Sequence, residues 1–123
     1  MRYDPDVGPD STPWLELDEA GRLAAVRQYH KRAKERAASP EAHAAIHVAV
    51  ETQLAEGHSS AKAALERLLR EGLDRHDAIH AIGSVLAGEM FAMLKSKRPH
   101  DAAAYSRKLD ALTASGWRAG SQQ

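Results

Sequence analysis

The sequence predicts an all-α fold: a compact bundle of four to five helices with an extended Pro-rich N-terminal arm. Hydrophobic residues make up 43% of the 123 positions but aromatic residues only 5%, so the core must be largely aliphatic, which suits closely packed helices. Apolar residues also recur at helical spacing, and no segment carries a strand signal. Ser, Asp and Gly stand where such helices would begin and end.

Residues 1–16 are expected to form the arm, because they hold three of the five prolines, and Trp14 would pin it to the helical body. A first helix is expected from the N-cap Asp18 to about Ala38. His30 lies in the apolar stripe of this helix. The opposite side is expected to face solvent and carries four charged residues: Arg27, Lys31, Lys34 and Glu35.

Four further helices are expected, each opened by a capping residue. They run from Pro40 to about Glu56, from Ser59 or Ser60 to Gly72, from Asp74 to about Ser96, and from Asp101 to Gly116. Gly83 would lie on an inward face, where a close helix approach explains a residue that costs about 1 kcal/mol relative to Ala. We therefore expect one helical domain over residues 17–116 and a frayed tail over residues 117–123.

Charge and composition restrict the classes of partner and site. The 17 basic and 17 acidic residues cancel, so the strong positive field that drives binding to nucleic acid or an anionic membrane is lacking. The absence of cysteine excludes disulfides, thiolate zinc sites and cysteine nucleophiles. The start lacks a signal-peptide run, and no segment is expected to reach the ~18 apolar residues of a membrane span. We expect a soluble cytoplasmic protein, and the Ala-rich faces suggest a homodimer.

Two histidine pairs at helical spacing are the main indication of function: His43 with His47, followed by Glu51, and His76 with His80. Residues four apart share one face of a helix, and both pairs fall on the apolar face that must be buried. If the two helices pack together, four imidazoles and one carboxylate converge. Neutral imidazole is the commonest protein metal ligand, and a nitrogen and oxygen set without thiolate suits Zn, Fe or Ni.

We therefore predict a divalent transition-metal site between these helices, with the four paired histidines as ligands. Glu51 would be a fifth ligand or a base that acts on metal-bound water. A histidine-rich mononuclear or hemerythrin-like site fits better than a ferritin-like di-iron site, because the Glu-x-x-His motifs of the latter are not present. His30 is a weaker candidate for an additional ligand, whereas His58 and His100 are expected at the surface.

Two alternatives use the same residues differently. In the first, the protein is a non-catalytic structural or interaction protein, and its buried neutral histidines form a hydrogen-bond network without metal. In the second, the doublet His76-Asp77 belongs to an HD-like metal-dependent phosphohydrolase, another all-helical class. His47 would then supply the upstream histidine, and Asp101 or Asp110 the downstream carboxylate.

The stretch from His43 to about Leu109 resembles an uncharacterised bacterial family, domain-of-unknown-function family 1841. Its pattern is H-x-x-x-H-x-x-x-E-x-Q-L, followed by H-x-A-x-H, L-x-E and D-A-A-A-Y. The matching residues here are His43, His47, Glu51, Gln53, Leu54, His76, Ala78, His80 and the segment from Asp101 to Tyr105, whereas Glu89 falls two residues from the position that the L-x-E element gives it. The resemblance implies that the histidines act as a unit, and it carries no activity. Glu89 points about 180° from His80 on an ideal helix, so it should face the last helix or a second subunit.

Overall fold

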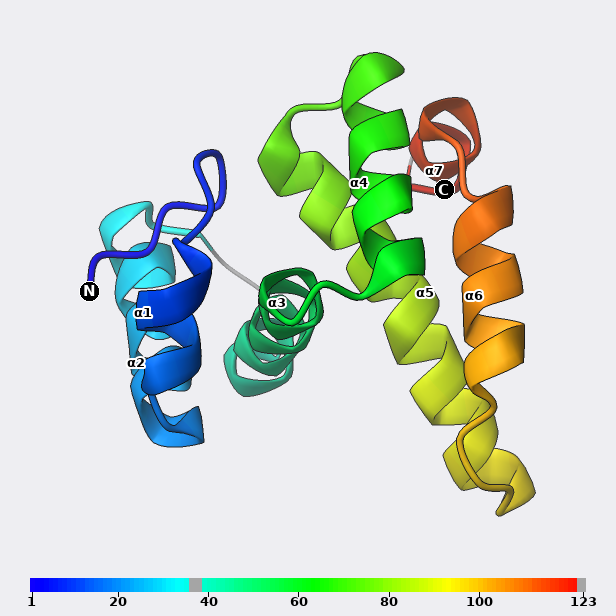
Figure 1. Cartoon of the computed structure of the whole chain (residues 1–123), viewed down its shortest axis with the longest axis horizontal. Coiled ribbons are helices and arrows are strands. Elements are labelled where there is room, and N and C mark those ends of the chain that lie inside the picture. Colours follow the sequence, from blue (N-terminus) through cyan, green and yellow to red (C-terminus); the bar gives the residue numbers. More distant parts are fainter. Residues whose placement is uncertain (36–38, 122–123) are drawn as a thin grey trace.

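The computed structural model of the chain describes residues 1–35 and 39–121, and these residues contain seven helices and no strand. The helices are α1 (Ser11–Glu16), α2 (Glu19–Arg32), α3 (Pro40–Ala55), α4 (Ser59–Arg70), α5 (Arg75–Ser96), α6 (Ala102–Ala111) and α7 (Ala114–Ser121). The all-α class is confirmed, whereas the predicted count of four to five helices is too low. In Figure 1, α3 lies between the α1–α2 pair on one side and α4 to α7 on the other.

The extended arm predicted for residues 1–16 is not confirmed, because the segment is part of the packed body. Its second half forms α1, in which Pro13 falls in the first turn, where a missing backbone N–H costs nothing. Trp14 is fully buried, and its Nε1 donates to Thr52 Oγ1 at 3.1 Å. Tyr3 is only 1% exposed. The prolines that indicated an arm are therefore compatible with a short helix and a buried N-terminal segment.

α2 begins as predicted but ends earlier. Asp18 Oδ1 accepts a hydrogen bond from the backbone N–H of Gly21 at 2.7 Å and caps the helix. After the last helical residue the backbone of Lys34 is left-handed (φ 55°), and the N–H of Glu35 donates to the carbonyl of His30 at 3.0 Å. This turn closes the helix and places Glu35 beside its last turn. The predicted end near Ala38 lies outside the described residues.

α3 and α5 match their predicted ranges closely. Each helix begins directly after a residue whose side chain caps it. Asp74 Oδ1 accepts from the backbone N–H of Asp77 at 2.7 Å and caps α5. The cap of α4 differs from the prediction. His58 takes this role in place of Ser59 or Ser60, because its Nδ1 accepts from the N–H of Ala61 at 3.1 Å.

The last predicted helix is divided into α6 and α7. The guanidinium of Arg67 in α4 donates through Nη2 to the carbonyls of Leu109 and Leu112, at 2.6 and 2.9 Å. These bonds satisfy the end of α6 and hold an extended residue after it. Residues 117–121, expected to be frayed, belong to α7, and residues 122–123 lie outside the described part.

Two apolar clusters meet at α3. The larger one is aliphatic and joins α3 to α4, α5, α6 and the start of α7, whereas the smaller one contains Tyr3 and Trp14 and joins α3 to α1 and α2. α3 and α5 approach closely because Gly83 has no side chain: a Cβ at this position would lie 2.5 Å from Ile46 Cγ2. The close approach inferred for Gly83 from the sequence is therefore present. It brings the histidine faces of both helices together.

α5 is long and apolar enough, by length and composition, to cross a membrane, with a mean hydropathy of 1.3 over its best window. It nevertheless packs against α3, α4, α6 and α7, which is the behaviour of a core helix. Its C-terminal part exposes Met90, Phe91 and Leu94. The homodimer remains a prediction.

Candidate metal centre

Five histidines from three helices form one cluster, called here the histidine cluster: His30 of α2, His43 and His47 of α3, and His76 and His80 of α5. Neighbouring rings have centroids 4.3 to 5.3 Å apart. His47 is the centre, because its ring contacts those of the other four. It is also the most buried of them, at 1% exposed.

The cluster forms where the sequence predicted a convergence of side chains. The i,i+4 spacing puts both histidines of α3 and both of α5 on the faces through which these helices touch. The structure thus brings together all four paired histidines. It adds His30, which the last turn of α2 places 4.6 Å from His43 between ring centroids.

The cluster divides into two groups of three whose ligand atoms all lie within 4.8 Å of one another. One group is His30, His43 and His47, and the other is His47, His76 and His80. Two nitrogens bound to one zinc ion at 2.0–2.1 Å in a tetrahedron are roughly 3.3 Å apart. Small side-chain rotations would therefore suffice to place either group around an ion.

A buried chain of hydrogen bonds fixes the ring of His47. Tyr3 donates its hydroxyl proton to Glu51 Oε2 at 2.5 Å, so the Tyr3 oxygen is left as an acceptor for His47 Nδ1–H at 3.1 Å. His47 is then protonated on Nδ1, and its Nε2 lone pair faces His80 Nε2 at 3.0 Å. Arg75 completes the chain with two bonds to the Glu51 carboxylate, at 2.7 and 2.9 Å.

Glu51 therefore has a different environment from the one the sequence predicted. Both of its oxygens are engaged by Arg75 and Tyr3, and the side chain is 1% exposed. It belongs to neither histidine group. Its contact with the cluster is indirect, through the Tyr3 hydroxyl and His47. Carboxylates that orient metal-bound histidines through the second ring nitrogen occupy this kind of position.

Two buried nitrogens of the cluster have no hydrogen-bond partner: His30 Nε2 and His76 Nε2. Each belongs to a different histidine group. Buried polar atoms in native proteins are almost always paired, so unpaired ones point to an absent ligand, ion or water. Glu35 Oε2 lies 3.4 Å from His30 Nε2 without making a hydrogen bond, and Glu35 Oε1 lies 3.6 Å from His76 Nδ1.

Four histidines of the cluster, His30, His43, His47 and His80, are neutral near pH 7. Burial, followed by the neighbouring His80, lowers the pKa of His47 to about 2. Burial, followed by the nearby His76, lowers the pKa of His80 to about 4. The pKa values of His30 and His43 are also lowered, chiefly by burial. The imidazoles thus keep free lone pairs, as metal ligands must.

A groove of about 390 Å³ between α3 and α5, called here the α3–α5 groove, reaches the cluster from outside. His43, His47 and His80 are among its lining residues. The other lining residues are small or apolar, apart from the hydroxyls of Ser39 and Ser84. A water molecule or a small neutral molecule could approach the histidine nitrogens along this groove.

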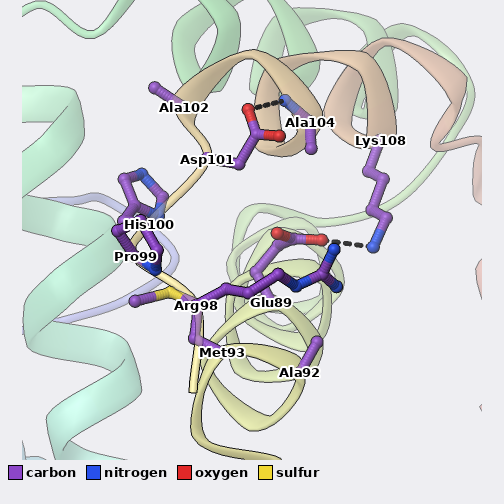
Figure 2. Close-up of a pocket in the computed structure, with 10 residues that line it drawn as sticks. All are labelled: Glu89, Ala92, Met93, Arg98, Pro99, His100, Asp101, Ala102, Ala104 and Lys108. Atoms are coloured by element: carbon purple, nitrogen blue, oxygen red, sulfur yellow. Dashed lines mark hydrogen bonds and ion pairs between the residues drawn. The ribbon is translucent and has the colours of Figure 1, made fainter. Parts of the chain in front are cut away.

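The carboxylates proposed for a phosphohydrolase are not part of this arrangement. Asp77, Asp101 and Asp110 belong to neither histidine group. Asp101 caps α6 by accepting from the N–H of Ala104 at 3.0 Å, and it lines a separate pocket (Figure 2). The doublet His76-Asp77 therefore contributes only its histidine to the cluster.

Glu89 lies in that separate pocket, between the end of α5 and the start of α6, which we call the Glu89 pocket (Figure 2). Lys108 of α6 donates to its carboxylate, and Arg98 and His100 also line the space of about 470 Å³. Glu89 is 6% exposed. It thus faces the last part of the chain, as its angle from His80 indicated.

Tyr3, Glu35 and Arg75 contribute to the site without having been singled out in the sequence. Their partners are far away along the chain: Tyr3 is 44 residues from His47, and Arg75 is 24 residues from Glu51. No local periodicity links such positions. Tyr3 is an aromatic residue in a polar, proline-rich segment that also contains Trp14, and this pattern by itself assigns it no role.

Helical packing and five converging imidazoles define an all-α protein with a candidate metal centre. The family model described as "Domain of unknown function (DUF1841)" matches residues 16–111, and the chain belongs to this family. The matched range includes the whole histidine cluster with Glu35, Glu51 and Arg75, whereas Tyr3 lies before it. No curated protein and no solved structure matches the chain.

Proposed function

We propose that the protein binds a divalent transition metal through the histidine cluster. His43, His47, His76 and His80 are the proposed ligands, and His30 is added to them. An all-imidazole set without thiolates suits Zn, Fe or Ni. The observation that carries the proposal is the pair of buried nitrogens without partners, His30 Nε2 and His76 Nε2.

The supporting hydrogen bonds agree with this proposal. His47 is held in one tautomer by Tyr3 and, behind it, by Glu51 and Arg75. Such an arrangement directs the Nε2 lone pair toward the centre of the cluster and raises its basicity. Glu51 is thereby proposed as a positioning residue, in place of the ligand or base that its spacing suggested.

The α3–α5 groove gives the proposed centre an open side. Catalytic metal sites keep a coordination position for water or substrate, whereas structural sites are closed by protein ligands. Because His43, His47 and His80 line the groove, a small neutral molecule would reach an ion there. A metal in this position would supply Lewis acidity to a bound oxygen.

Metal content tests the proposal directly. Tag-free protein is analysed by inductively coupled plasma mass spectrometry beside a His47→Ala/His80→Ala variant. We expect at least one ion per wild-type chain and its loss from the variant. His100→Ala is the matched control, because His100 is exposed and lines the Glu89 pocket. A metal-free wild type that stays folded and does not respond to added Zn, Fe or Ni would contradict the proposal.

A second candidate function is a structural or interaction protein in which the histidines form a hydrogen-bond network. The bond between His47 Nε2 and His80 Nε2 and the bond from His47 to Tyr3 favour it. The two candidates differ in their response to a chelator. Chelation should lower the melting temperature of a metal protein and leave that of a metal-free network unchanged.

A further inference from the structure

One ion held by either histidine group would leave one of the two unpartnered nitrogens without a ligand. No group with all ligand atoms within 4.8 Å contains both His30 and His76 among the described residues. Two ligands on opposite sides of one zinc ion are separated by at most about 4.2 Å, twice the Zn–N distance. Two separate ion positions follow, one beside each of these histidines.

His47 can serve only one of the two positions. Its Nδ1 is occupied by Tyr3, so Nε2 is its single free nitrogen. That nitrogen lies 3.0 Å from His80 Nε2, close to the separation of roughly 3.3 Å between two ligands of one tetrahedral ion. His47, His80 and His76 therefore form a complete group of three. His30 and His43 remain and lack a third ligand.

Glu35 is the carboxylate nearest to His30 that could supply this third ligand, and its side chain would have to move, because His30, His43 and Glu35 do not form a group with all ligand atoms within 4.8 Å. Its Oε2 is 3.4 Å from His30 Nε2, again the separation expected between two ligands of one ion. Its Oε1 is 3.6 Å from His76 Nδ1, on the side where a carboxylate can accept the proton of that nitrogen. His76 would then be protonated on Nδ1 and would present Nε2 to the second ion, as metal-bound histidines commonly do.

Charge favours the same residue. Imidazole ligands bring no negative charge, so two divalent ions would introduce four positive charges into a partly buried site. Within the described part of the chain, Glu35 is the acidic residue that lies within 4 Å of a cluster ring. Its side chain is 32% exposed, so it can move by the small distance that coordination requires.

We propose, on the basis of the metal-binding function above, that the site holds two ions: one bound by His30, His43 and Glu35, and the other by His47, His76 and His80. Glu35 links the two positions, since one oxygen is a ligand of the first ion and the other orients His76 toward the second. The protein is thereby a two-metal protein with one carboxylate shared between its ion positions.

The number of bound ions tests this proposal. Chelator-treated protein is titrated with CoCl₂ in a calorimeter, and the Co²⁺ absorption bands are followed in parallel. We expect two Co²⁺ ions per wild-type chain and one in Glu35→Gln. Glu41→Gln is the matched control, because Glu41 is an exposed glutamate at the start of α3, and it should keep both ions.

Each outcome has a distinct meaning. One ion in the wild type, or two ions in Glu35→Gln, would overturn the two-ion proposal and leave the metal-binding function standing. No ion in the wild type would overturn both. The Mn²⁺-loaded wild type gives a second measurement that needs no variant: we expect a spin-coupled electron paramagnetic resonance spectrum, and an isolated six-line spectrum at full loading would contradict two neighbouring ions.

Discussion

The histidine cluster and the Glu89 pocket both bury ionisable side chains beside α5. They differ in how the energetic cost of burying such a side chain is offset. Glu89 is charged and meets a cation, Lys108, which donates directly to its carboxylate. His47 and His80 in the cluster avoid charge, because burial lowers their pKa values. Only the cluster is left with buried nitrogens that have no partner among the described residues. Unpartnered lone pairs, rather than burial of ionisable groups, therefore distinguish a candidate ligand site from an ion pair.

The two regions also differ in how they are supported. A chain of hydrogen bonds through three buried or half-buried side chains supports the ring of His47. These side chains are Tyr3, Glu51 and Arg75. The Glu89 carboxylate depends on Lys108, whose side chain is 58% exposed. Substitutions in the two regions should thus have effects of different size and kind.

The largest effect on stability is expected from Arg75→Met. It would leave the Glu51 carboxylate buried with only Tyr3 as a partner, and breaking a buried pair costs about 3–5 kcal/mol of unfolding free energy. Urea unfolding of the metal-free protein measures this cost. A loss below about 1 kcal/mol would show that the Arg75–Glu51 pair does not hold the cluster together.

Acid should destabilise the metal-free protein next most strongly. The pKa values of His47 and His80 are lowered in the folded state to about 2 and about 4, from the ordinary value of 6.5. The unfolded chain therefore binds more protons below pH 6.5, so stability is full above this pH and falls as the pH decreases toward 4. We expect a loss of about 4 kcal/mol between pH 7 and pH 5, about 2 kcal/mol from each histidine. Unfolding free energies that do not change over this range would contradict buried neutral histidines.

The substitution Tyr3→Phe distinguishes two roles of Tyr3: its hydrogen bond to the proposed ligand His47 and the packing of its ring. The ring stays, but His47 Nδ1–H loses its acceptor, and loss of such an outer partner typically weakens metal affinity about 10–100-fold. Tyr105→Phe is the matched control: Tyr105 is equally buried and donates to Gln53 Oε1 at 2.7 Å, away from the histidine groups. Both variants should lose about 1–2 kcal/mol of stability. Equal affinities for Zn²⁺ in the two variants would remove Tyr3 from the proposed centre.

The smallest effect is expected from Lys108→Met in the Glu89 pocket. Its exposed ammonium is partly screened by solvent, so the loss of stability should be about 1 kcal/mol. Metal content and affinity should stay at wild-type values, since Lys108 belongs to neither histidine group. A parallel loss of bound metal would show that the two regions of α5 are coupled.

Local signals made most of the helical boundaries predictable. Asp18, Ser39, Asp74 and Asp101 cap their helices in the structure as the sequence indicated. The division between α6 and α7 could not be predicted in this way, because it depends on hydrogen bonds from Arg67, more than 40 residues earlier. α1 was missed because prolines in a first helical turn look the same in sequence as prolines in an extended arm.

The candidate site shows the same division between local and distant information. The i,i+4 pairs made the convergence of four histidines predictable, since spacing alone puts each pair on one face. Glu35 was expected on the solvent side of a longer helix. It returns to His30 only because α2 ends at Arg32 and the left-handed Lys34 turns the chain back. The partners of Glu51 could not be predicted from local sequence patterns either, because Tyr3 and Arg75 lie 48 and 24 residues away from it.

Histidine ring nitrogens in long-range ¹H–¹⁵N spectra report most directly on whether the cluster binds metal. All seven histidines are observed in the metal-free protein and again after addition of Zn²⁺. We expect His47 to be protonated on Nδ1 before addition, and the ring signals of the cluster histidines to shift afterwards while those of His58 and His100 stay in place. Unchanged cluster signals at saturating Zn²⁺, or shifts confined to His58 and His100, would contradict a metal centre built on the histidine cluster.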